Sequence, residues 1–341
     1  MSVTSNGHRP RAALAMSPGA AAAVIDDRAL KAFAESCELL PGPILDDFGT
    51  AHARAVLANV EVLITGWGCP PIDAEVLAAA PRLRAVVHTA GSIRAHITAA
   101  CWDRGIAVSS AAAANALPVA EYTVAMILLT GKRVFERARE YQVRRARDNW
   151  LATPREVGNF GRTVGILSAS LIGRRVIDLL RPYDLRVLLH DPYVSTEDAA
   201  ALGVPLVGLE ELFRTSDVVS VHTPLLPATT GLVSRELIAA MRSDAVLVNT
   251  ARGAVVDQDA LAEAAQQGRV RAVLDVTDPE VLPASHPLWD CDNVLITPHL
   301  AGSQGNEWRR LAELAAAELR RWAEGVGFAH PVRRERLDLT A

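Results

Sequence analysis

The chain has 341 residues, of which 50% are hydrophobic and 22% are charged, and its formal net charge is −4. This length is enough for two domains, because one hydrophobic core rarely grows beyond about 250–300 residues. Without a basic excess, neither nucleic acid nor an anionic membrane surface is expected as the main partner. We find no apolar stretch of about 20 residues and therefore expect no membrane span.

The N-terminal residues are predicted to form a short disordered lead into a first strand near residues 12–16. Ser17-Pro18-Gly19 interrupts the alanine-rich stretch too early for a signal peptide. The four cysteines form no CxxC pair and no zinc-like spacing with histidine. We therefore expect reduced, mostly buried thiols, no bound metal and a cytoplasmic protein.

Short apolar runs alternate with segments of helical period along most of the chain. This alternation predicts an α/β fold built of βαβ units with parallel sheets. The runs are apolar throughout rather than apolar at every second residue, so helices are expected on both faces of each sheet. The further candidate strands are 62–65, 85–88, 106–109, 163–167, 186–190, 218–221, 245–249, 272–275 and 294–297.

One long helix is predicted from Leu117 to Val143, with Pro118 in its first turn. Its first half is almost wholly apolar, and such a helix needs cover on more than one side. We expect it to link the two domains and to pack against a second copy, which makes the protein a homodimer. The alternative is a helix buried within its own chain.

Residues 163–174 are typical of a strand that runs through a tight turn into a helix. The dinucleotide-binding pattern of this turn is G-x-G-x-x-G, and here the three positions are Ser168, Ser170 and Gly173, followed in the helix by Arg174. The helix N-terminus still offers free N–H groups, including those of Leu171 and Ile172, to a pyrophosphate. We predict that cofactor binding survives but is weakened by the serines, and that glycine at 168 and 170 would tighten it. The alternative is a plain packing turn.

Asp191 ends the next strand, about twenty residues later. A carboxylate there accepts hydrogen bonds from the ribose hydroxyls and repels a 2′-phosphate, and no arginine follows it in Pro192-Tyr193. The pattern favours NAD over NADP. The alternative is a surface aspartate in a turn before proline.

Three segments that follow strands bring chemistry-bearing residues to the carboxyl ends of the sheet, where ligands of open parallel sheets bind. They carry Arg252, Asp278 and His299. Arg252 can hold a carboxylate through two hydrogen bonds, and His299 can exchange a proton with a carbonyl oxygen near neutral pH. Asp278 can hold the other ring nitrogen of the histidine. Singly, a surface arginine, a turn aspartate and a capped histidine would each be ordinary, but together they predict hydride transfer between a nicotinamide and a small 2-oxo or 2-hydroxy acid.

At these residues the chain resembles the D-isomer-specific 2-hydroxyacid dehydrogenase family, which includes phosphoglycerate dehydrogenase and hydroxypyruvate reductase. The resemblance extends from about Glu61 to about Leu314. Besides the glycine turn and Asp191-Pro192, the segments that carry it are 86–94, 115–121, 216–225, 248–253, 274–276, 287–289 and 297–299.

The resemblance implies two Rossmann-like domains with a cleft between them and roles for named residues. Arg252 would bind substrate, His299 would be the acid/base, and Asp278 would stand where most members have glutamate. The backbone of Ala90, Gly91 and Ser92 would receive the substrate carboxylate. Nicotinamide would lie near Thr123, Thr250 and Asp275, and the adenosine side near His222 and Pro224.

The expected domains are residues 1–128 with 302–341, which bind substrate, and residues 129–301, which bind NAD. A C-terminal helix near 305–324 would complete the first domain, and members of the family are usually dimers through the long helix. Arg94 is a candidate second cation for a doubly charged substrate, or else a solvent-facing arginine. The altered glycine turn and Asp278 leave open a catalytically weak, NAD(H)-sensing binding protein of the same fold.

Overall fold

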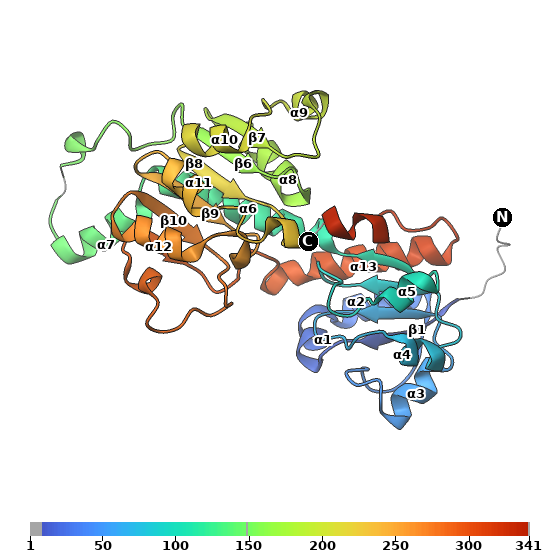
Figure 1. The fold of residues 1–341 in the computed structure, drawn as a ribbon. Coiled ribbons are helices and arrows are strands. Elements are labelled where there is room, and N and C mark those ends of the chain that lie inside the picture. Colours follow the sequence, from blue (N-terminus) through green and yellow to red (C-terminus); the bar gives the residue numbers. More distant parts are fainter. Residues whose placement is uncertain (1–8, 148, 340–341) are drawn as a thin grey trace. The chain divides into compact units, whose positions relative to one another are not determined.

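A computed structural model describes residues 9–147 and 149–339. The chain divides into two compact units, which are described separately (Figure 1). Unit 1 comprises the residues up to Asn115 together with Ser303–Leu339, and unit 2 comprises Ala116–Gly302. The lead expected before the first strand falls largely on residues 1–8, which lie outside the described residues.

Unit 1 contains a six-stranded sheet in the order β12-β5-β4-β3-β1-β2. All neighbouring strands are parallel except β12, which runs antiparallel to β5. The strands are β1 (Arg11–Ala15), β2 (Glu38–Leu39), β3 (Val62–Thr65), β4 (Ala85–His88), β5 (Ala107–Ser110) and β12 (Pro331–Val332). The helices are α1 (Pro18–Val24), α2 (Asp27–Ser36), α3 (Ala51–Leu57), α4 (Ala74–Ala79), α5 (Ala99–Asp103) and α13 (Trp308–Ala323).

Unit 2 contains a second six-stranded sheet, in the order β11-β10-β9-β8-β6-β7, and all of its neighbouring strands are parallel. The strands are β6 (Thr163–Leu167), β7 (Arg186–His190), β8 (Val218–Val221), β9 (Ala245–Asn249), β10 (Val270–Leu274) and β11 (Val294–Ile296). The α-helices are α6 (Ala112–Gly131), which starts in unit 1, α7 (Val134–Arg144), α8 (Leu171–Leu180), α9 (Thr196–Leu202), α10 (Leu209–Thr215), α11 (Arg235–Ala240) and α12 (Gln258–Gln266).

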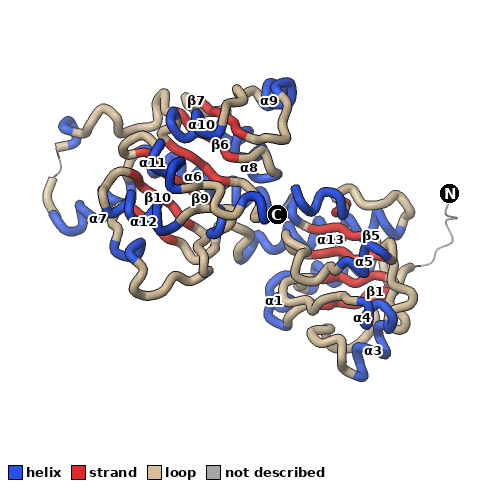
Figure 2. Tube along the Cα trace, viewed as in Figure 1, coloured by secondary structure: helices blue, strands red, loops and turns tan. Residues whose placement is uncertain are grey.

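Helices cover both faces of each sheet, as the continuous apolar strands predicted (Figure 2). Successive strand residues point to opposite faces, so each apolar strand supplies two cores. In unit 1, Val62 packs in the core with α2 and α13, whereas Leu63 packs in the core with α3, α4 and α5. In unit 2, Val246 packs with α6 and α8, and Leu247 packs with α10, α11 and α12. The prediction of two Rossmann-like α/β domains is confirmed.

The single helix predicted for 117–143 is wrong, because the structure has two helices there. α6 ends at Gly131, and α7 begins at Val134 after Arg133, whose φ of 52° interrupts helical geometry. The predicted domain boundary at 128/129 falls inside α6, whereas the contacts divide the chain at 115/116. The reason is that Val124 and Ile127 of α6 belong to a core of unit 2.

The expectation that the chain lacks a long apolar segment is also wrong. α6 has 20 residues and contains an 18-residue window with a mean hydropathy of 1.5, so by length and composition alone it could cross a membrane. The helix meets the sheet of unit 2 through Ala120, Val124 and Ile127. Core helices pass the same test, so this finding is weak evidence for a span.

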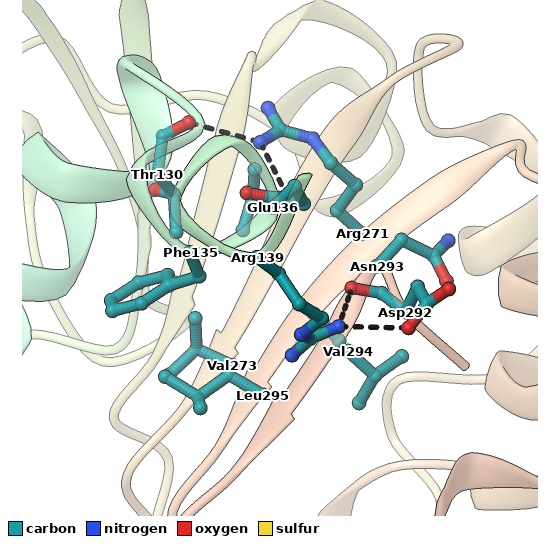
Figure 3. Close-up of a pocket in the computed structure, with 12 residues that line it drawn as sticks. Thr130, Phe135, Glu136, Arg139, Arg271, Val273, Asp292, Asn293, Val294 and Leu295 are labelled. Carbon is teal, nitrogen blue, oxygen red and sulfur yellow. Dashed lines mark hydrogen bonds and ion pairs between the residues drawn. The ribbon is translucent and has the colours of Figure 1, made fainter. Parts of the chain in front are cut away.

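A buried charge network attaches α7 to the sheet of unit 2 (Figure 3). Arg271 of β10 has a side chain that is only 6% exposed, and it pairs with Glu136 of α7 at 3.3 Å and with Asp244 at 3.1 Å. It also donates to the carbonyl of Thr130 at the end of α6. Beside it, Arg139 pairs with Asp292 in a solvent-exposed contact. Arg271 therefore fixes the base of α7, while Arg139 adds a surface contact.

These two arginines allow a matched test of burial. We expect Arg271→Met to lower the free energy of unfolding by about 3–5 kcal/mol, because two partly buried carboxylates lose their cation. Arg139→Ala, which breaks an exposed pair on the same helix face, is expected to cost less than about 1 kcal/mol. Urea unfolding of both variants measures the difference, and equal losses would contradict the assignment.

Candidate functional site

The turn after β6 has the geometry that the glycine pattern predicts, although two of its positions are serines. Ser168 has a φ of 81°, a left-handed conformation that favours glycine. Ser170 has ordinary extended geometry and caps α8, since its Oγ accepts from the N–H of Gly173 at 3.3 Å. A Cβ at Gly173 would lie 2.0 Å from the carbonyl oxygen of Ser168, so only glycine fits there.

The N-terminus of α8 retains N–H groups for an anion. Gly173 and Arg174 already donate to Ser170, the one to its Oγ and the other to its carbonyl. The first N–H groups of a helix have no intrahelical acceptor, so those of Leu171 and Ile172 remain directed out of its end. The residues present therefore fit a pyrophosphate at this position.

Asp191 lies against this turn. Its Oδ2 accepts from the N–H of Ala169 at 2.8 Å, and its Oδ1 accepts from the N–H of Tyr193 at 2.8 Å. Each carboxylate oxygen has a second lone pair, so both can still accept from ribose hydroxyls. Two large side chains are exposed close by in the chain: Leu171, the first residue of α8, and Tyr193, two residues after Asp191. Both offer apolar surface.

His222 and Pro224, expected on the adenosine side, follow β8. The side chain of His222 is buried and bonds through Nε2 to the Oγ of Ser220, while burial lowers its pKa to about 3. Its backbone N–H donates to the carbonyl of Leu167 at the end of β6. His222 is therefore a neutral residue packed behind the turn. Pro224 is partly buried, and its carbonyl accepts from Thr229.

The loop that carries His299 is held by a buried carboxylate. Asp275, 1% exposed at the end of β10, accepts from the hydroxyl of Thr297 at 2.6 Å and from the N–H groups of Leu300 and Ala301, both at 2.9 Å. Its carbonyl accepts from the N–H of His299, whose φ is 52°. A strained backbone of this kind persists only where its surroundings impose it. Here it leaves the imidazole 48% exposed.

The carboxylate partner of His299 is Glu280, and the prediction that Asp278 fills this place is wrong. The Oε1 atom of Glu280 lies 2.5 Å from Nδ1 of His299. Asp278 is exposed and engages Gln258 only through its backbone N–H and carbonyl. Glu280 lies two residues further along the chain. Most members of the family have glutamate as the partner of this histidine, so the residue type of Glu280 could have identified it from the sequence.

Arg252 lies in a loop that packs on the loop of Glu280. The loop follows β9 and is closed by Asn249, whose side chain donates to the carbonyl of Arg252 and accepts from the N–H of Ala251. A Cβ at Gly253 would lie 2.1 Å from the carbonyl carbon of Thr277, so the two backbones touch there. Because β9, β10 and β11 are neighbours in the sheet (Figure 1), Arg252, Glu280 and His299 all follow the carboxyl ends of adjacent strands.

The residues expected near the nicotinamide form hydrogen bonds within unit 2. The hydroxyls of Thr123 in α6 and Thr250 after β9 lie 3.1 Å apart. The hydroxyl of Tyr122 lies 2.8 Å from that of Thr297, which in turn donates to Asp275. α6 is thereby tied to two of the loops that carry site residues.

The expected carboxylate cradle lies in unit 1, directly after β4. Within the described part of the chain, the N–H groups of Ala90, Gly91, Ser92 and Ile93 donate no hydrogen bond. Consecutive free N–H groups of this kind form a concavity suited to an anion. Arg94 is exposed and donates to the carbonyl of Leu337.

Residues 124–301 match the family model for the NAD-binding domain of D-isomer specific 2-hydroxyacid dehydrogenases. The chain is 34% identical over 255 residues to a D-3-phosphoglycerate dehydrogenase of Mycobacterium leprae, covering 73% of this chain and 47% of that protein. It is 35% identical over 272 residues to a glyoxylate reductase of Aeropyrum pernix, covering 77% and 80%. A phosphoglycerate oxidoreductase structure from Rhizobium etli superposes with a TM-score of 0.81 at 22% identity, covering 96% and 99%, which shows the shared fold.

The chain therefore belongs to the D-isomer specific 2-hydroxyacid dehydrogenase family, as its motifs predicted. The match to an NAD-binding domain confirms the predicted cofactor. The chain spans about half the length of the curated phosphoglycerate dehydrogenases that it matches.

The two serines of the turn are expected to act differently. Ser168→Gly should raise the free energy of unfolding by up to about 1 kcal/mol, because it removes a left-handed serine. Ser170→Gly should tighten NADH binding, because a Cβ is removed where the backbone approaches the pyrophosphate, at a cost of only a few tenths of a kcal/mol from the lost cap. Urea unfolding and NADH fluorescence titration separate the two effects, and identical behaviour would contradict these roles.

Glu280→Gln and Asp278→Asn form a second matched pair. If Glu280 orients His299, its amide variant should lose about 10- to 100-fold in turnover, as is common when the carboxylate partner of a functional histidine is removed. Asp278→Asn should leave turnover unchanged. The rate of NADH oxidation measures both, and a loss confined to the Asp278 variant would restore the original assignment.

Proposed function

We propose that the protein is an NAD-dependent oxidoreductase that transfers a hydride between nicotinamide and a small 2-oxo or 2-hydroxy acid. The observation that carries the proposal is the contact between Glu280 and Nδ1 of His299, in a loop beside that of Arg252. The names of the relatives, D-3-phosphoglycerate dehydrogenase and glyoxylate reductase, describe reactions of the same class.

His299 is proposed as the acid/base. Glu280 occupies Nδ1, which leaves Nε2 as the ring nitrogen that faces substrate. In the reductive direction Nε2 gives its proton to the carbonyl oxygen, and the carboxylate of Glu280 stabilises the charged ring before that transfer. The bound NADH supplies the hydride. In the oxidative direction Nε2 takes the proton back from the hydroxyl.

The substrate carboxylate is proposed to bind Arg252 and the backbone of Ala90, Gly91 and Ser92. Arginine offers a planar pair of donors that matches a carboxylate, and the free N–H groups of the cradle add further donors.

NAD is preferred over NADP in this proposal because Asp191 lies at the turn where a 2′-phosphate would bring a second negative charge. The alternative of a weak NAD(H)-sensing protein is not favoured. It rested partly on Asp278 as a departure from the family, and Glu280 now supplies that carboxylate. The buried, unpaired cysteines are compatible with the proposed cytoplasmic location.

A homodimer through the region of residues 117–143 is part of the proposal. α7 has no buried residue, and apolar side chains stay exposed along it and in the segment that follows. These are Tyr141 at 60%, Val143 at 82%, Leu151 at 76% and Phe160 at 90% exposed. An interface between two copies would remove these apolar side chains from water.

The activity is tested by NADH depletion with glyoxylate, hydroxypyruvate, pyruvate, 2-oxoglutarate and bulkier aromatic 2-oxo acids. We expect turnover with at least one of them and a loss of about 10²- to 10⁴-fold in His299→Ala. Arg252→Lys should raise KM, because an ammonium cannot make the paired contact. NADH binding without turnover on any acid would support the sensing alternative instead.

The dimer is tested by light scattering. The protein should have twice the mass of one chain, and Val143→Glu combined with Phe160→Glu should give the mass of a monomer. Tyr183→Glu, which alters an exposed aromatic residue elsewhere in unit 2, is the control and should stay dimeric. A monomeric wild type would exclude this surface as a self-interface.

A further inference from the structure

The last described segment of the chain, residues 329–339, is fixed to unit 1 by a buried carboxylate. Glu318 of α13 is only 2% exposed. Its oxygens accept from the hydroxyl of Ser109 in β5 at 2.9 Å and from the N–H groups of Ala329 and His330 at 3.1 and 2.8 Å. A carboxylate buried in this way must be hydrogen-bonded, so the groups that donate to it are held in place. The turn after α13 is therefore fixed beside the edge of the sheet, where β12 pairs with β5.

Beyond β12 this C-terminal segment reaches the loop that contains the carboxylate cradle. Leu337 is partly buried and packs against the core of unit 1 to which Ile93 and Ile97 belong. Its backbone carbonyl accepts a hydrogen bond from the guanidinium of Arg94. The C-terminal segment and the cradle loop are thus joined both by packing and by a hydrogen bond.

A turn closes the cradle at its end. The carbonyl of Ile93, whose N–H is the last of the cradle, accepts from the N–H groups of His96 and Ile97 at 3.2 and 3.0 Å. Arg94 is the second residue of this turn. Its bond to the carbonyl of Leu337 therefore attaches the turn, and with it the end of the cradle, to the C-terminal segment.

This attachment bears on binding because the cradle would hold an anion with several N–H groups at once. Consecutive N–H groups converge on one anion only while the backbone keeps its shape. Ordering a loose backbone costs free energy, and that cost is subtracted from the free energy of binding. A loop that is already fixed in the binding conformation avoids this loss.

We propose that Arg94 is a positioning residue that holds the backbone of residues 90–93 ready for the carboxylate of the substrate. It acts through the carbonyl of Leu337 and not by touching substrate. This role differs from the second substrate cation expected from the sequence, because the guanidinium donates to the chain's own backbone. The inference rests on the proposed function in naming the anion as a 2-oxo acid, whereas the attachment stands on the contacts of unit 1.

The test separates the hydrogen bond from the charge. Arg94→Met keeps a long side chain but cannot donate, whereas Arg94→Lys keeps a donor for the Leu337 carbonyl. We expect Arg94→Met to raise KM by about 3- to 10-fold for every 2-oxo acid that is turned over, with kcat and the Kd for NADH little changed. Arg94→Lys should stay close to wild type. Leu337→Ala, which removes the packing that seats the carbonyl, should raise KM in the same way.

The control is Arg334→Met, which removes another arginine contact of the same C-terminal segment. Arg334 pairs with Asp103 at 2.7 Å, and both side chains are more than half exposed. An exposed ion pair contributes little to stability, and this one does not involve the cradle loop. KM should therefore stay at the wild-type value.

Hydrogen exchange of the peptide that covers residues 94–98, followed by mass spectrometry, supplies a readout that needs no turnover. The N–H groups of His96 and Ile97 are protected by their bonds to Ile93, so they report opening of the turn. Faster exchange is expected in Arg94→Met and Leu337→Ala, whereas Arg94→Lys should match wild type.

The outcomes separate the two proposals. Unchanged KM and unchanged exchange in Arg94→Met would overturn the positioning role, and so would a fall in kcat without a change in KM. An increase in KM confined to acids with a second acidic group, such as 2-oxoglutarate, would overturn it as well and make Arg94 a substrate-binding cation. If the wild type turns over none of the 2-oxo acids, the proposed function fails, and the exchange pattern alone decides whether Arg94 holds the turn.

Discussion

The buried carboxylate of Asp275 is the constraint on which the site in unit 2 depends. A carboxylate in an apolar core must be hydrogen-bonded, and here its partners are a hydroxyl and two N–H groups of the loop after the neighbouring strand. Satisfying this one group bends residues 297–301 around it. The strained conformation of His299 and the outward direction of its ring follow from that bend.

The loop of Arg252 and the turn after β6 are held in place by close backbone contacts, as the loop of His299 is held by Asp275. Gly253 lets the loop of Arg252 touch the segment that leads to Glu280, and Gly173 lets α8 approach the turn after β6. Both contacts leave no room for a side chain. In a parallel sheet the carboxyl ends of all strands lie along one edge, so loops of different strands must pack on one another there. Few residues are therefore needed to hold the candidate site together, because the parallel sheet already brings these loops side by side.

The sequence pattern predicted most strands because a doubly covered strand has a simple signature. An unbroken apolar run can only be buried on both sides, as Val62 and Leu63 or Val246 and Leu247 are. The same reasoning failed for the long helix. The apolar first half of the predicted helix is buried, as expected. The helical period of the sequence, however, did not indicate that Arg133 has a left-handed conformation and ends the helix. That conformation depends on packing and on the ion pairs of Arg133 and Arg271.

The candidate site was predictable to the level of loops but not of every side chain. Arg252 and His299 follow strand ends and could be chosen from their chemistry. Asp278 and Glu280 both follow β10, and both are carboxylates of the right kind. The chain path through Pro279 decides which of them reaches the imidazole, and it places Glu280 there. No local pattern distinguishes two carboxylates that are two residues apart in a loop.

Amino-acid order alone was sufficient for the α/β class, the nucleotide-binding turn, the acidic residue after β7 and the family, because each depends on residues that are close along the chain or on a repeating burial pattern. Tertiary packing was needed for the partner of His299 and for the end of α6. These features are contacts between segments far apart in sequence or choices among similar neighbours, and only the folded backbone sets those distances.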